Sequence, residues 1–181
     1  MSAQSENSRA ELNKPQKRGG RIRRYAPLVV WMCVIFFAST SEFSGAQTSR
    51  IIRPLLIWLF PNISEERISL VHFIVRKVAH FSEYAVFALL AARAFATSSH
   101  QILRRGFFYF TLALIFLYSL SDEFHQSFVP SRVGTIYDSL IDTAGGLTAL
   151  ILYTIWKLRK SRAKAQRRKE DDARSERHST A

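Results

Sequence analysis

Four apolar stretches, each carrying a few polar positions, alternate along this chain with charged connections. A helix needs roughly 20 mostly apolar residues to cross about 30 Å of hydrocarbon. On that measure the pattern predicts spans at about residues 25–41, 71–96, 106–128 and 137–158. The first stretch is slightly short for a span. A basic segment precedes it and small residues follow it, which is also typical of the core of a signal peptide. We favour a retained span, because other spans follow it.

A fifth apolar segment, Arg50 to Phe60, has only eleven residues and contains Pro54. It is too short to cross a bilayer, and it suits a helix or loop that rests on the lipid headgroups. The predicted fold is therefore all-α. It is a polytopic membrane bundle of four transmembrane helices, with an interfacial segment between the first two.

The second helix is expected to begin before the membrane does. Asn62 and Ser64 are good N-cap residues, and Glu65 and Glu66 favour the first turn of a helix. A helix from about Ser64 to Ala96 would start in water and enter the bilayer part-way along.

The two ends of the chain are highly basic and differ from its apolar middle. The chain has 181 residues, which suits one domain, here residues 25–158. Residues 1–24 form a basic tail, and residues 159–181 have too few apolar side chains for a core, which favours disorder. Anchoring to an anionic membrane surface explains the net charge of +12 without nucleic acid as a partner.

The distribution of basic residues predicts the orientation. The two ends and the connection between spans two and three carry twenty Lys and Arg, against six in the other connections. Because cytoplasmic segments are enriched in Lys and Arg, both termini are expected to be cytoplasmic.

Charged and polar residues recur within the last three spans, and the topology places them at one depth near the outer face. Such residues in membrane segments usually face a bundle interior or a watery cavity. We expect an outward-facing polar pocket. Its candidate binding residues are Lys77, Tyr84, Gln126, Arg132, Asp138 and Asp142, and its candidates for acid/base chemistry are His80, Glu83, Asp122 and Glu123.

Several interpretations of these residues stay open. No cofactor is identified, but imidazole with carboxylates suits a divalent metal, and His80, Glu83 and Glu123 are the minority candidates for ligands. The network could instead only hold helices together, in a monomer or a homo-oligomer. The third span could also end at Leu120, which would leave Asp122 and Glu123 solvated.

Three short motifs resemble the VanZ-like family. They are KVAHFSEY at residues 77–84, SDEFHQSFVPSR at residues 121–132, and Asp138 followed by Gly145. The resemblance covers about residues 73–152, and Asp142 stands where that family usually has asparagine. It implies a multi-pass protein of a bacterial inner membrane, and the namesake of the family is linked to resistance to the glycopeptide teicoplanin.

Two functions follow as hypotheses. The pocket would bind or modulate a cell-envelope component, such as an envelope lipid or a peptidoglycan precursor, in an antibiotic-resistance-type role. The alternative is an intramembrane enzyme that uses acid/base or metal chemistry on a lipid-linked substrate.

Overall fold

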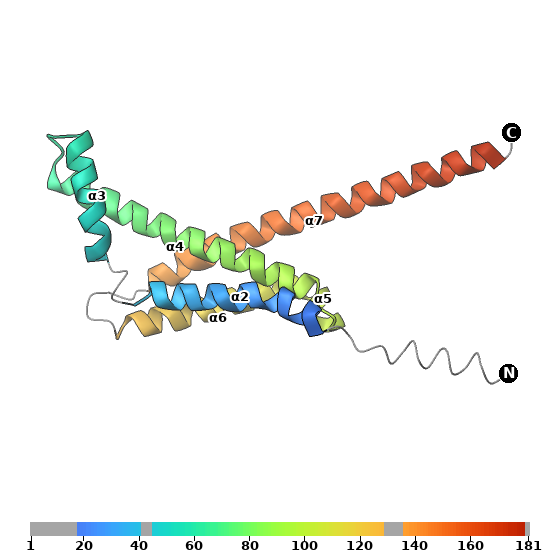
Figure 1. The fold of residues 1–181 in the computed structure, drawn as a ribbon, viewed down its shortest axis with the longest axis horizontal. Helices are drawn as coiled ribbons and strands as arrows, with labels where there is room; N and C mark the ends of the chain where they lie inside the picture. Colours follow the sequence, from blue (N-terminus) through green and yellow to red (C-terminus); the bar gives the residue numbers. More distant parts are fainter. Residues whose placement is uncertain (1–17, 41–44, 129–135, 180–181) are drawn as a thin grey trace.

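The structure of the protein, a computed structural model, describes residues 18–40, 45–128 and 136–179 and is helical throughout these ranges apart from short turns. Its helices are α2 (Arg18–Ala38), α3 (Gly45–Leu59), α4 (Glu65–Ala96), α5 (Gln101–Arg105), α6 (Phe107–Gln126) and α7 (Ile136–Ser179). Helices α2, α4, α6 and the first part of α7 pack together (Figure 1). The predicted all-α class is confirmed.

Three of the helices are long and apolar enough to cross a membrane: Glu65–Ala96, Phe107–Gln126 and Ile136–Glu170. Helix α2 is not among them. Its first turns carry Arg21, Arg23 and Arg24, so that its apolar part runs only from Tyr25 to Ala38 and falls short of roughly 20 residues. A fourth span in α2 therefore stays a prediction.

Helix α4 begins where its sequence predicts. Ser64 is the N-cap, and its hydroxyl accepts a hydrogen bond from the backbone N–H of Arg67 at 3.4 Å. Glu65 and Glu66 occupy the first turn, where carboxylates favour the positive end of the helix dipole. The helix then continues without interruption to Ala96.

Helices α4 and α7 cross at a point of close backbone contact. A Cβ added at Gly145 would lie 2.3 Å from the carbonyl oxygen of Phe81, so only glycine allows the two helices to come this near. The next residue faces the other neighbour, because a Cβ at Gly146 would lie 2.8 Å from Cγ2 of Ile115 in α6. The two glycines thus allow α7 to pack closely against both α4 and α6.

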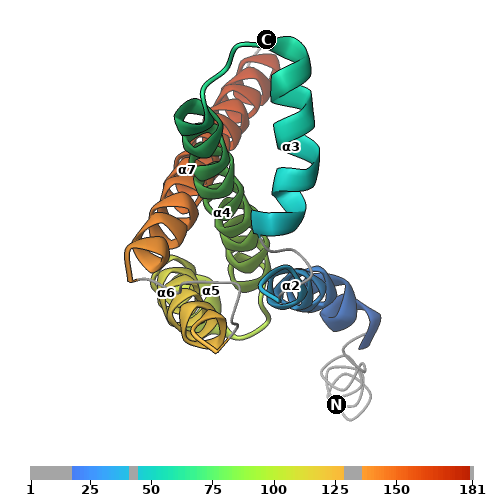
Figure 2. The same cartoon turned by 90° about the vertical axis from the view of Figure 1, so that its left-hand side faces the viewer.

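The apolar core lies on the C-terminal side of this crossing along α4. Tyr84 and Phe87 are fully buried, and three alanines that follow them on the same helix, Ala88, Ala91 and Ala94, complete a buried face. Small side chains let neighbouring helices approach closely. Helices α2 and α6 lie on the same side of α4 (Figure 2). Ile35 of α2 and Ile115 of α6 belong to the same buried cluster as the α4 residues.

The two ends of the bundle differ. The start of α2, the helix α5 and the long C-terminal part of α7 lie at one end, whereas α3 and the start of α4 lie at the other (Figure 1). The side-chain contacts agree, since Tyr25 near the start of α2 donates a hydrogen bond to Ser98 at the end of α4, at 3.1 Å. We refer below to the α3 end and the α5 end.

The C-terminal segment differs from the expectation of disorder, because α7 continues as a helix to Ser179. The segment is rich in Lys, Arg, Ala, Gln and Glu, which are strong helix formers. Pairs one turn apart add support, as in the hydrogen bond of 3.1 Å from Gln166 to Glu170. Residues 158–170 are exposed. Local helix propensity, rather than packing in a core, therefore favours the helix here.

Candidate functional site

Polar side chains from three helices meet near the α3 end of the bundle. We call this set the polar cluster: Lys77 and His80 of α4, Asp122, Glu123 and Gln126 of α6, and Asp138 and Asp142 of α7. Apart from Lys77, which is partly exposed, every member is buried. The sequence had assigned each of them to a polar site, and the fold brings them into neighbouring contacts.

Ion pairing joins α4 to α7 at the edge of the cluster. The Lys77 ammonium donates a hydrogen bond to Oδ1 of Asp138, and Nη2 of Arg76 lies 3.9 Å from Oδ2 of the same carboxylate. The Lys77 side chain is 21% exposed and that of Asp138 only 5%. A cation at the surface therefore covers a carboxylate that is largely withdrawn from solvent.

One turn further along both helices, a second contact repeats the pattern. Nδ1 of His80 lies 3.1 Å from Oδ1 of Asp142, in hydrogen-bonding distance. Because both partners advance in the chain by one turn, α4 and α7 run in the same direction through the crossing. His80 is 7% exposed and Asp142 is fully buried. Asp142, which stands in place of the expected asparagine, thus faces the histidine directly.

Glu123 reaches the same point from α6. One carboxylate oxygen of Glu123, a ring nitrogen of His80 and a carboxylate oxygen of Asp142 all lie within 4.8 Å of one another. Each of these groups is a common metal ligand. The sequence had suggested His80, Glu83 and Glu123 as ligands, and the structure groups the first and last of these with Asp142 instead of Glu83.

Asp122 serves a separate network that ties α6 to the end of α2. Ser39 donates a hydrogen bond to Oδ1 of Asp122 at 2.5 Å, and Gln126 donates to Oδ2 at 2.9 Å. The Gln126 amide also lies 3.3 Å from the Ser39 hydroxyl. All three residues are buried. The two adjacent acids therefore face different partners, as a separation of about 100° around a helix requires.

Helix α6 runs on to Gln126, so the alternative in which it ends at Leu120 with solvated acids is wrong. The amphipathic continuation keeps Asp122, Glu123 and Gln126 on the buried side, while Phe124 and Phe128 are exposed. Lys77 pairs with Asp138 of α7 and not with a residue further along its own helix.

Three other candidates from the sequence have different settings. Glu83 is half-buried, and its backbone carbonyl accepts a hydrogen bond of 3.0 Å from the indole of Trp31. Tyr84 is fully buried, and its ring packs edge-on against Phe87, with centroids 5.9 Å apart. Arg132 lies outside the described residues.

Ser39, Arg76 and the pair Ser119 and Ser139 take part in the site but were not predicted. The two serines exchange hydrogen bonds with each other's backbone carbonyls, at 3.2 and 3.3 Å, and join α6 to α7. Serine is common in spans as a small residue, so its presence there carries no signal. Ser119 and Ser139 do lie on the same helical faces as Asp122, Glu123 and Asp142, which was the one available clue.

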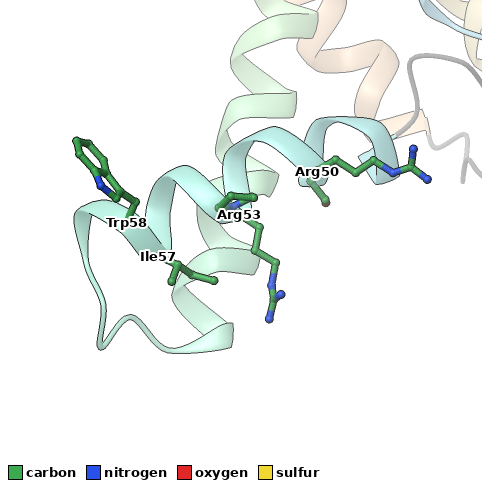
Figure 3. A pocket seen from close by; sticks show the side chains of 6 residues that line it. Arg50, Arg53, Ile57 and Trp58 are labelled. Atoms are coloured by element: carbon green, nitrogen blue, oxygen red, sulfur yellow. The ribbon is translucent and has the colours of Figure 1, made fainter.

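Two cavities lie on the α3 side of the molecule and not at the polar cluster. One, of about 710 Å³, is lined by residues of α3 that include Arg50, Arg53, Ile57 and Trp58 (Figure 3). The other, of about 670 Å³, is lined by the turn after α3 and the start of α4, with Arg67 among its residues. An outward-facing hollow at the polar cluster itself stays a prediction.

Span-length apolar helices with a charged interior define a class of helical protein of the membrane type. The chain belongs to the VanZ/LLP1 family, whose model matches residues 25–157. That range contains the whole polar cluster. Neither the curated proteins nor the solved structures gave a match.

Proposed function

We propose that this protein binds the polar part of a cell-envelope component at the polar cluster, from the outer side of a bacterial inner membrane. One observation carries the proposal: charged side chains from three separate helices gather at the same level of an otherwise apolar bundle. A charge at membrane depth costs several kcal/mol unless it is paired or hydrated, and residues of this kind typically mark the path or site of a polar ligand.

The edge of the cluster is the place where a ligand would enter. Lys77 is the partly exposed member, and Arg76 beside it is also partly exposed, so both cations are accessible from the α3 end. A phosphate or carboxylate of an envelope lipid or peptidoglycan precursor would meet these cations first. The carboxylates behind them would then face the amine or hydroxyl groups of the same molecule.

Helix α3 suits the membrane surface at this end. Its exposed apolar side chains include Ile51, Leu55 and Trp58, whereas Arg50 and Arg53 supply positive charge. Helices of this composition lie in the headgroup region, and tryptophan is enriched there. In this arrangement α3 rests on the outer leaflet, and the groove beside Arg50 and Trp58 faces lipid headgroups (Figure 3).

The basic residues agree with this orientation. The α5 end carries the start of α2, with Arg21, Arg23 and Arg24, and the basic C-terminal part of α7. Placing that end in the cytoplasm follows the excess of Lys and Arg on cytoplasmic segments. The polar cluster then lies towards the outer leaflet, where an envelope-targeting antibiotic such as teicoplanin would act.

A purely structural role is the main competitor, and a paired apolar substitution separates the two. Replacing a buried ion pair by apolar residues of similar size is often neutral or stabilising, whereas removing one partner is strongly destabilising. The double variant Lys77→Met/Asp138→Leu should therefore fold but lose ligand binding. Lys157→Met is the matched control, because it removes a lysine from the α5 end, where Lys157 lies 4.2 Å from the centre of the Phe107 ring.

The test expresses wild type, the double variant and the control at equal levels in a glycopeptide-susceptible bacterium. Teicoplanin susceptibility is measured, and lipids that copurify with each protein are identified by mass spectrometry. Wild type and control should reduce susceptibility and retain a common lipid, and the double variant should do neither. A folded double variant that behaves as wild type would refute the proposal. The intramembrane-enzyme alternative stays a prediction.

A further inference from the structure

We propose that His80, Glu123 and Asp142 bind one divalent transition-metal ion inside the helical bundle. This site needs only the ion as its ligand, so it does not rest on the proposed function. We refer to these three residues as the metal-ligand trio. Each comes from a different helix, α4, α6 or α7, so the site exists only in the folded bundle.

The spacing of the ligand atoms suits one ion with a small closing movement. Metal–ligand bonds of about 2.0 Å in a tetrahedral site place neighbouring ligand atoms roughly 3.3 Å apart. One ring nitrogen of His80, one carboxylate oxygen of Glu123 and one carboxylate oxygen of Asp142 lie within 4.8 Å of one another. Ligand atoms as far as 4.8 Å apart reach the tetrahedral spacing when they close by about 1.5 Å.

Burial and an unpartnered oxygen supply the second, independent observation. His80 and Glu123 are 7% exposed and Asp142 is fully buried. While Oδ1 of Asp142 faces His80, its other oxygen, Oδ2, is buried without a hydrogen-bond partner among the described residues. A buried carboxylate oxygen without a partner is costly, and a cation provides the missing coordination.

Other carboxylates in the same cluster show the contrast. Both oxygens of Asp122 accept hydrogen bonds from Ser39 and Gln126, and both oxygens of Asp138 lie near Lys77 or Arg76. These two groups are satisfied by protein atoms alone. Asp142 differs from them in pointing one oxygen at an imidazole and leaving the other for an additional partner.

The ligand set selects the kind of ion. One imidazole with two carboxylates is a mixed set of nitrogen and oxygen ligands, which suits Zn²⁺, Mn²⁺ or Fe²⁺. Ca²⁺ instead prefers sites made only of oxygen ligands. The metal-ligand trio supplies three protein ligands, which is the number typical of zinc sites that keep a fourth position for water or another ligand. Zn²⁺ and Mn²⁺ are therefore the probes of choice.

The experiment measures metal binding by the full chain, purified in detergent without a histidine tag and stripped with a chelator. Zn²⁺ or Mn²⁺ is added, and bound metal per chain is measured by mass spectrometry after gel filtration. The absorption spectrum with Co²⁺ reports the ligand environment. The variants are Asp142→Asn and Glu123→Gln, which change carboxylates to amides of equal size. The matched control is Asp138→Asn, which makes the same change one turn away on the same helix.

We expect about one tightly bound ion per chain in wild type and in Asp138→Asn, and at least roughly tenfold weaker binding in Asp142→Asn and Glu123→Gln. The ion should also raise the unfolding temperature of wild type, because it binds only the folded protein. Wild type that binds no ion, or both trio variants binding as tightly as wild type, would overturn the proposal. If Asp142→Asn does not fold, Glu123→Gln decides.

Discussion

Gly145 of α7 faces the backbone of Phe81 in α4 so closely that an added Cβ would lie 2.3 Å from the Phe81 carbonyl oxygen. This contact sits between the polar cluster and the apolar core. It brings α7 near enough for Asp142 to reach His80 and for Asp138 to reach Lys77. The candidate site therefore depends on a residue that has no functional group of its own.

Gly145→Ala should destabilise the bundle by about 1–3 kcal/mol, because the backbone of Phe81 cannot yield as a flexible side chain can. The better helix propensity of alanine, about 1 kcal/mol, offsets only part of this. The free energy of unfolding in detergent measures the effect. Gly20→Ala is the control, since nothing lies within 4 Å of a Cβ there, and it should not destabilise. Equal losses of stability for the two substitutions would show that the close contact with the Phe81 backbone is not the cause.

Ser39→Ala should cost about 1–3 kcal/mol, because it leaves Oδ1 of the buried Asp122 without its short hydrogen bond from the serine hydroxyl. Gln126→Leu should cost a similar amount, and the two effects should be non-additive since both residues bond the same carboxylate. A double-mutant cycle on chemical unfolding tests this. Thr40→Ala is the control, because the Thr40 hydroxyl donates to the backbone carbonyl of Phe37, in the last turn of α2, at an exposed site. Additive effects would indicate that Ser39 and Gln126 act independently.

Trp31→Phe should lower stability by about 0.5–1.5 kcal/mol, because the indole N–H donates to the Glu83 carbonyl and joins α2 to α4. The same substitution at Trp156, which is exposed on α7, is the matched control and should change stability by less than about 0.5 kcal/mol. Thermal unfolding followed by circular dichroism compares the two. A larger loss of stability at Trp156 would show that packing along α7 stabilises the bundle more than the hydrogen bond from α2 to α4 does.

Removal of residues 161–181 should leave the stability of the bundle within about 0.5 kcal/mol, since residues 158–170 are exposed on the part of α7 that projects from the bundle (Figure 1). The helical circular dichroism signal should fall because α7 is shortened. Attachment to vesicles rich in anionic lipid should weaken, at about 1 kcal/mol for each basic residue that lies near the surface. Unchanged vesicle attachment would show that residues 161–181 do not anchor the protein to the membrane.

Local signals predicted α4 well. The capping serine and the two glutamates that follow it are close in sequence, and the helix begins at Glu65 and ends at Ala96 as expected. The helical continuation of α6 through Gln126 could also be anticipated from its amphipathic pattern. These features depend on neighbours within one turn, which a single sequence displays directly.

Partner choice within the site could not be predicted in the same way. His80 was expected to act with Glu83, three residues along the same helix, yet its carboxylate partner is Asp142 of α7. Which face of α7 meets α4 is decided by the glycine contact and by the rotation of both helices, and neither is encoded in the spacing on one helix. The role of Ser39 could not be predicted for a similar reason, because it depends on how α2 and α6 end side by side.

The same glycine contact also sets the phase of α7. One residue inserted between Asp142 and Gly145 would turn the earlier part of the helix by about 100° and carry Asp142 and Asp138 away from α4 together. An insertion beyond Leu158 would rotate only the exposed part of α7 that projects from the bundle. The length of this short interval, rather than the identity of the acids alone, therefore keeps the two helices in register at the site.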